Sequence, residues 1–179
     1  MVPRSRDEGI YYRREDYAGL WRRILVSAVD AVVVFAGLVA LLLVGDAILS
    51  ASGAALGFLI WLVLAYVYLV VCKRSRTRTL GYRLGRVKIV SIHGDSPRTG
   101  RVAFRLLFAL IGGGFSSMLG LIDLFWITGD DHRQTLRDKL AHTYVIRTSA
   151  EPLGRGPIGY DVYHVMAWTL LVPGVRRRP

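Results

Sequence analysis

One apolar run of 21 residues, Ile24 to Val44, constrains this chain more than any other part of its sequence. A bilayer-spanning helix needs about 20 residues at roughly 1.5 Å each, so the run is long enough to cross. Asp30 is the one charged residue within it. A carboxylate at that depth costs about 2.5–3.5 kcal/mol on insertion scales, so it is usually kept for a function and given a partner. Arg23, seven residues earlier on the same helical face, is the predicted partner.

Two more apolar runs follow, and the overall composition agrees with a membrane protein. Ala54–Cys72 carries no charge, and Val102–Thr128 is longer. Hydrophobic residues make up 53% of the chain and the mean hydropathy is +0.37, yet the formal net charge is +11. A soluble nucleic-acid-binding protein can be as basic, but it would not carry such apolar runs. We therefore expect an α-helical membrane protein whose partner is a bilayer with anionic lipids, and no nucleic acid.

The basic residues predict the orientation. Arginines crowd residues 1–23, and the loop Lys73–Arg105 is strongly basic, whereas the connection Gly45–Gly53 contains Asp46 and no Lys or Arg. By the positive-inside rule, the N-terminus and the basic loop are cytoplasmic. The basic loop also supplies candidates for binding lipid headgroups, namely Arg74, Arg76 and Arg78.

The third apolar run, residues 102–128, allows two interpretations. It is either one tilted span or a re-entrant helical hairpin that turns at Gly112–Gly114. Basic residues crowd both of its ends, which favours the hairpin because both ends would then be cytoplasmic. In a hairpin, Asp123 would lie near the depth of Asp30, and the two carboxylates could share a proton or a cation in an ion path.

The remaining segments predict a small cytoplasmic β-element and a separate tail. Arg86–Ile92 and Thr143–Ile146 have strand composition, and we expect them to pair. The chain then divides into residues 1–23, a membrane domain of residues 24–147, and a tail of residues 148–179. Tyr160–Val172 is too short and polar to span and predicts an interfacial amphipathic helix. We find no internal repeat.

Motifs for enzymes, metals and cofactors are absent from the sequence. Cys72 is the only cysteine, and the four histidines show no metal-ligand spacing. No phosphate-binding loop or placed catalytic triad occurs. We therefore expect no enzyme activity, no cofactor and no metal.

Three motifs together carry a resemblance to a known family. They are Tyr17-Ala-Gly-Leu-Trp-Arg-Arg-Ile-Leu with Asp30, then Thr79-Leu-Gly-Tyr-Arg-Leu-Gly-Arg-Val87 with Gly94, Pro97 and Arg105, and Arg133-Gln-Thr-Leu-Arg-Asp-Lys-Leu-Ala-His-Thr143. In order and spacing they resemble the RDD family of integral membrane proteins, named for an arginine and two aspartates. The chain departs from the family at Arg137, where a histidine is frequent, and at His142, where glycine is usual. The larger side chain at position 142 bears on the local turn geometry.

The resemblance implies that Arg23, Asp30 and Asp138 are the signature residues. Some members of the family are associated with sodium/proton exchange, and many occur fused to or beside other membrane modules. From the residues, Asp138 is expected to pair with Arg22, Arg23 or a loop arginine and so to clamp the cytoplasmic layer to the first span.

Two functions follow as alternatives. The chain is either a non-catalytic accessory subunit that associates with other membrane chains or its own copies, or a small cation/proton transporter with Asp30 as the carrier. For both we expect a multi-pass protein of the bacterial cytoplasmic (inner) membrane.

Overall fold

The computed structural model describes residues 8–115, 117–165 and 168–176, and the chain forms two compact units. One unit contains residues 21–86. The other combines residues 1–20 with residues 87–179. The N-terminal residues therefore belong to the same unit as the second half of the chain.

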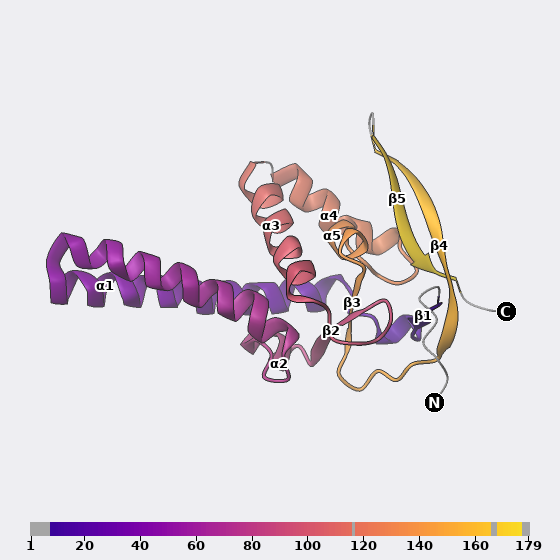
Figure 1. Ribbon diagram of the computed structural model, residues 1–179, viewed down its shortest axis with the longest axis horizontal. Helices are drawn as coiled ribbons and strands as arrows, with labels where there is room; N and C mark the ends of the chain where they lie inside the picture. Colours follow the sequence, from indigo (N-terminus) through magenta and orange to yellow (C-terminus); the bar gives the residue numbers. More distant parts are fainter. Residues whose placement is uncertain (1–7, 116, 166–167, 177–179) are drawn as a thin grey trace. The chain divides into compact units, whose positions relative to one another are not determined.

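The unit of residues 21–86 is built on α1, Leu20–Tyr66, which consists of two antiparallel limbs (Figure 1). Leu20–Ile48 and Ser52–Cys72 are each long and apolar enough to cross a membrane. The second limb ends in the π-helical segment η2, Val67–Cys72. Both predicted apolar helices are confirmed, but the expected connection of residues 45–53 is wrong at its start, because the helix continues to Ile48.

Small residues let the two limbs approach closely. A β-carbon on Gly45 would lie 2.3 Å from the carbonyl oxygen of Gly53, so a larger side chain would not fit there. Further along, the Trp61 indole Nε1 donates a hydrogen bond of 2.8 Å to the carbonyl oxygen of Val34. This close backbone contact through small residues is typical of helices packed in a bilayer, where lipid offers no hydrophobic drive for association.

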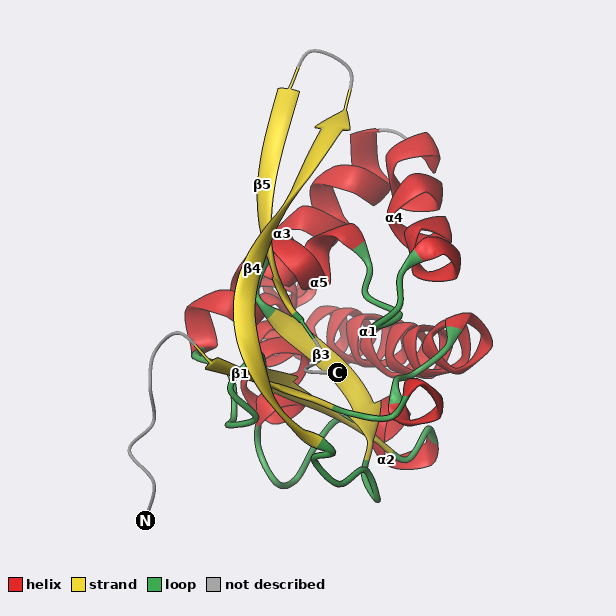
Figure 2. Ribbon diagram, turned by 90° about the vertical axis from the view of Figure 1, so that its right-hand side faces the viewer, coloured by secondary structure: helices red, strands yellow, loops and turns green. Residues whose placement is uncertain are grey.

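The third apolar run forms two helices, α3 (Thr99–Phe115) and α4 (Ser117–Gly129), that pack side by side (Figure 2). A β-carbon on Gly120 would lie 3.9 Å from the carbonyl oxygen of Gly112, which a straight helix does not allow over eight residues. The run therefore folds as a helical hairpin rather than as one continuous helix, and its re-entrant position in the bilayer stays a prediction. The expected turn at the glycines is wrong, since α3 runs through Gly112–Gly114. Propensity costs of about 1 kcal/mol per glycine are too small to end a helix that packs well.

The predicted strand pair is confirmed. β2 (Val87–Ser91) and β3 (Thr143–Arg147) pair antiparallel, with Val87 opposite Arg147 and Ser91 opposite Thr143. A short helix precedes each strand along the chain: α2 (Leu80–Leu84) before β2 and α5 (Leu136–Leu140) before β3.

The expected interfacial helix in the tail is wrong. The tail forms a β-hairpin of β4 (Gly154–Val165) and β5 (Trp168–Val175). The strand β4 also pairs with β1 (Glu8–Tyr11), beside which it lies in Figure 2. Between β1 and α1 lies one short 3-10 turn, η1 (Arg14–Asp16). Pro173 directly follows the stretch Tyr160–Val172 and lies within β5, and the β-branched and aromatic residues of this stretch suit a strand. The β-structure is thus larger than the sequence predicts.

Aromatic and β-branched side chains from all of these strands form the core of this unit. Its buried members are Tyr12, Tyr17, Val90, Ile92, Tyr144, Ile146, Ala150 and Val175. The tail is part of this core through Val175, whose side chain would clash with any β-carbon on Gly9.

Candidate functional site

The Asp30 carboxylate lies in the first limb of α1 and is almost fully buried, with 3% of the residue exposed. Its Oδ1 accepts hydrogen bonds from the backbone N–H of Gly81 at 2.9 Å and from the Tyr68 hydroxyl at 3.1 Å. Its Oδ2 accepts from the Thr79 hydroxyl at 2.9 Å and forms an ion pair of 3.6 Å with the ammonium of Lys73. Both carboxylate oxygens therefore accept hydrogen bonds, and Lys73 compensates the buried charge.

The sequence around α2 explains why it can meet this carboxylate. Thr79 is the N-cap of α2, and its hydroxyl also accepts from the N–H of Tyr82. A β-carbon on Gly81 would lie 2.3 Å from the carbonyl oxygen of Val26 and 2.7 Å from the Asp30 carboxylate. Only glycine lets the first turn of α2 come this close to α1.

The predicted pairing of Arg23 with Asp30 stays a prediction. Arg23 is buried, with 7% exposed, and the ion pair described for Asp30 is with Lys73. The neighbouring Arg22 donates to the carbonyl oxygen of Gly85 at 2.9 Å, at the other end of α2. Basic side chains thus hold both the carboxylate and the C-terminal end of α2.

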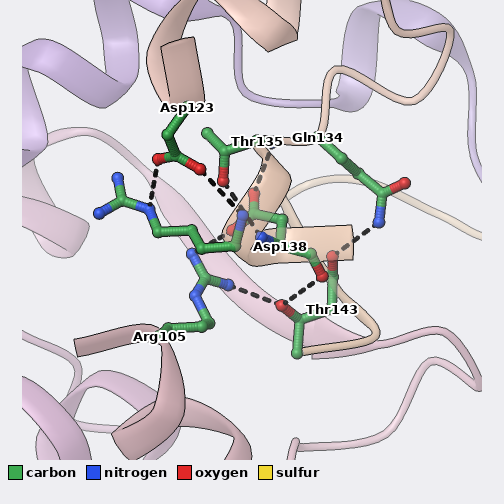
Figure 3. A network of polar contacts seen from close by, with 7 residues as sticks. Arg105, Asp123, Gln134, Thr135, Asp138 and Thr143 are labelled. Carbon is green, nitrogen blue, oxygen red and sulfur yellow. Dashed lines mark hydrogen bonds and ion pairs between the residues drawn. The ribbon is translucent and has the colours of Figure 1, made fainter. Parts of the chain in front are cut away.

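Asp138 lies at the centre of a second polar network, in α5 (Figure 3). The residue is fully buried, and its carboxylate forms an ion pair of 2.6 Å with Arg105 of α3. Thr135 and Asp138 form a capping box, in which each side chain accepts from the other's backbone N–H. Arg105 also donates to the hydroxyl of Thr143, the first residue of β3. Of the partners predicted for Asp138, which are Arg22, Arg23 or an arginine of the basic loop Lys73–Arg105, the structure shows the last one, Arg105.

Asp123, in the middle of α4, binds the same short helix through Arg137. The Arg137 backbone N–H donates to Oδ1 at 2.9 Å, and its guanidinium Nε lies 3.1 Å from Oδ2. Arg137 and Asp138 are adjacent, so one turn of α5 binds both the middle of α4 and the N-terminal half of α3 (Figure 3). Asp30 and Asp123 lie in different units, and the shared proton or cation between them stays a prediction.

A third ion pair in this unit is not predicted from the sequence. Asp130, directly after α4, lies 2.6 Å from the ammonium of Lys139, and both side chains are buried. Its other oxygen accepts from the backbone N–H groups of His132 and Gln134. The sequence signal for Asp130 is an aspartate followed by a turn, because the carboxylate in such a turn accepts hydrogen bonds from backbone N–H groups a few residues later.

The two short helices are built alike, although no repeat is visible in the sequence. Each begins with Thr-Leu, has a threonine N-cap, spans five residues and is followed by a residue with positive φ, Arg86 at 50° or His142 at 54°. Each also offers the N–H of its second residue to a buried aspartate of the preceding apolar hairpin, at 2.9 Å in both cases. Asp123 is therefore the structural counterpart of Asp30.

Burial shifts the titration of groups around the β2–β3 core. It raises the pKa of Tyr144 well above 10, with nearby Tyr17, Asp130 and Tyr12 adding to the rise. It lowers the pKa of His142 below its usual 6.5, and the positive charge of Arg101 and the nearby His93 lower it further. Both groups are neutral at pH 7, which suits a packed core.

Within residues 8–115, 117–165 and 168–176, no group of three His, Cys, Asp or Glu side chains could hold a metal ion. The lipid candidates lie just after η2, where Arg76 is exposed and Arg74 and Arg78 are half-buried. The arrangement can neutralise buried charge and fix helix ends.

Comparison with known proteins identifies one family. The model of the RDD family matches residues 17–142, which spans both polar networks and excludes β1 and the tail hairpin. Neither a curated protein nor a solved structure matches the chain.

Proposed function

Since the chain belongs to the RDD family and is a membrane protein with two apolar helices, we propose that it serves as a non-catalytic accessory subunit of a larger membrane complex. Its setting in this proposal is the bacterial inner membrane, crossed by both limbs of α1, with the N-terminus in the cytoplasm. The basic residues of the loop then face anionic lipids.

The observation that carries this proposal is that the buried carboxylates are already saturated. Asp30 accepts three hydrogen bonds and has Lys73 beside it, while Asp123 and Asp138 each have an arginine. A carrier must release its partners to load and unload an ion, and that costs several kcal/mol at a buried pair. Such a network is better suited to holding a scaffold in one shape.

One topological argument supports a single face for the non-membrane parts. β2 precedes the α3–α4 hairpin and β3 follows it, yet the two strands pair directly. Both ends of the hairpin therefore lie on one side of the bilayer. β1 pairs with β4 in the same unit, so the N-terminal strand shares that side. A scaffold of this kind offers one broad surface to a partner.

The test is purification from native membranes in a mild detergent, with the mass and all co-purifying chains recorded. An accessory subunit should come with a second chain at a fixed ratio. A soluble bait protein present at the same copy number serves as the control. Recovery of the protein with no second chain would count against the proposal.

The transporter alternative keeps one specific observation in its favour, the burial of Asp30 beside a tyrosine hydroxyl and a lysine. Purified protein in sealed liposomes would then show cation-driven proton flux, and Asp30→Asn would abolish it. We expect no flux from the unmodified protein.

A further inference from the structure

A cavity of about 340 Å³ lies between the two limbs of α1, and its lining is almost entirely apolar. Val33, Gly37 and Leu41 line it from the first limb, and Trp61, Ala65 and Tyr68 from the second. Its volume lies at the lower end of the range of small-ligand sites, about 300–1,000 Å³. The cavity is open to its surroundings rather than enclosed, so a lipid chain can reach it where the limbs cross a bilayer.

The cavity is built rather than incidental, because the side chains that create it are held in place. Trp61 is fixed by its hydrogen bond to the carbonyl oxygen of Val34, and a β-carbon on Gly37 would lie 4.0 Å from the Trp61 ring. Tyr68 is fixed by donating to Asp30 and accepting from the N–H of Leu80. The indole thus holds the limbs apart, while the small residues Gly37 and Ala65 leave the space unfilled.

The charge at one end of the cavity indicates what fills it. Cys72 is the last lining residue, and Lys73 follows it directly, with Arg74, Arg76 and Arg78 in the next five positions. Lys73 is already engaged by Asp30 and lies 4.9 Å above the Tyr82 ring, but Arg76 is exposed. An apolar slot that is followed along the chain by one exposed and two half-buried arginines matches an acyl chain joined to an anionic headgroup.

We propose that this cavity binds one anionic phospholipid of the surrounding bilayer, with an acyl chain between the limbs and the phosphate at Arg76 and Arg78. The inference rests on the proposed bilayer setting and deepens it, because it assigns one bound lipid to one site. Tyr68 lines the slot and also holds Asp30, so the lipid contacts the network that positions α2.

The experiment is native mass spectrometry of the full chain in a nonionic detergent, titrated with phosphatidylglycerol or with phosphatidylcholine of identical chains. We expect one retained lipid and a preference for phosphatidylglycerol. Arg76→Gln with Arg78→Asn should reduce that preference about 10- to 30-fold, since each surface arginine contributes roughly a factor of five. Asparagine suits position 78 because Arg78 has a φ of 52°. The matched control, Arg13→Gln with Arg14→Gln, removes the same charge from exposed positions elsewhere and should leave the preference unchanged.

A second pair of variants tests the binding of the acyl chain in the cavity. Ala65→Leu fills the cavity and should lower retention of both lipids, whereas Ala55→Leu makes the same change on an exposed face and should not. As a second readout, phosphatidylglycerol should slow maleimide modification of Cys72 in the unmodified protein.

Equal retention of the two lipids, or unchanged retention in Ala65→Leu, would overturn the proposal. Failure of the bilayer setting itself would be seen separately, as release of the chain from membranes by alkaline carbonate.

Discussion

At the scale of single residues, His142 adopts a backbone conformation that glycine would adopt more easily. Its φ is 54°, in the left-handed region, and glycine is the residue that the family resemblance implies there. His142→Gly should therefore stabilise the protein by about 0.5–1 kcal/mol, the relief of strain being offset by greater freedom of the unfolded chain. Thermal unfolding in detergent measures the effect. Arg147→Gly, an exposed strand residue in β3, is the control and should destabilise.

The same residue predicts a pH dependence. Burial, then Arg101 and His93, lowers the pKa of His142 in the folded protein. The unfolded chain therefore binds more protons between that lowered pKa and about 6.5, and stability falls as the pH drops through this interval. Above about pH 6.5 the contribution is fully present. Unfolding temperatures compared at pH 7.5 and pH 5.5 should show a smaller loss in His142→Gly than in the unmodified protein. An equal loss in both would assign the dependence to other groups.

At the scale of elements, α2 can bind the Asp30 carboxylate only if position 81 has no side chain. Gly81→Ala places a carbon 2.3 Å from the backbone of Val26, and this overpacking should cost about 1–3 kcal/mol or displace α2. Gly100→Ala is the matched control, because nothing lies within 4 Å of the added carbon in the helix α3. That change should be neutral or slightly stabilising, since alanine favours a helix. Similar unfolding temperatures for the two variants would argue against the close contact.

The short helix α5 depends on a buried ion pair in the same way. Arg105→Met removes the guanidinium 2.6 Å from the fully buried Asp138 carboxylate and should cost about 3 kcal/mol or more. Adding Asp138→Asn should recover part of that loss, because the charge needing compensation is gone. Arg98→Met, at an exposed arginine just before α3, should change stability by less than about 0.5 kcal/mol. A double variant no more stable than Arg105→Met would contradict the pairing.

The elements also show which parts of the fold the sequence predicts. Long apolar runs identify both limbs of α1, and β-branched composition identifies β2 and β3, because each signal is local. The strand β1 and the tail hairpin are missed, since β1 is stabilised by pairing with β4, more than 140 residues away. Charge at both ends of the third run predicts the hairpin, whereas its turning point depends on packing between α3 and α4.

The residues of the candidate site also divide into those that the sequence predicts and those that it does not. Asp30 and Asp123 are recognisable as charges in apolar runs, and Asp138 through the family resemblance. The partners of Asp30 are not recognisable, because Lys73, Thr79 and Gly81 lie 43 to 51 residues further along the chain. Only the structure reveals that α2 and α5 hold their aspartates in the same way.

At the scale of the whole molecule, strand pairing and charge together predict the topology. Because β2 pairs with β3, we expect the residues on either side of the α3–α4 hairpin to lie on one face of the bilayer, and the positive-inside rule predicts that this face is cytoplasmic. The turn between the limbs of α1 should then be outside.

After Cys72→Ala removes the native cysteine, single cysteines at the exposed positions Asp46, Arg98 and Ser149 provide three probes. An impermeant maleimide added to intact cells should label position 46 alone, and lysis should expose the other two. Labelling at 149 but not at 98 would separate β3 from β2 across the membrane and refute the hairpin. Labelling at both 98 and 149, with 46 protected, would preserve the fold and reverse its orientation.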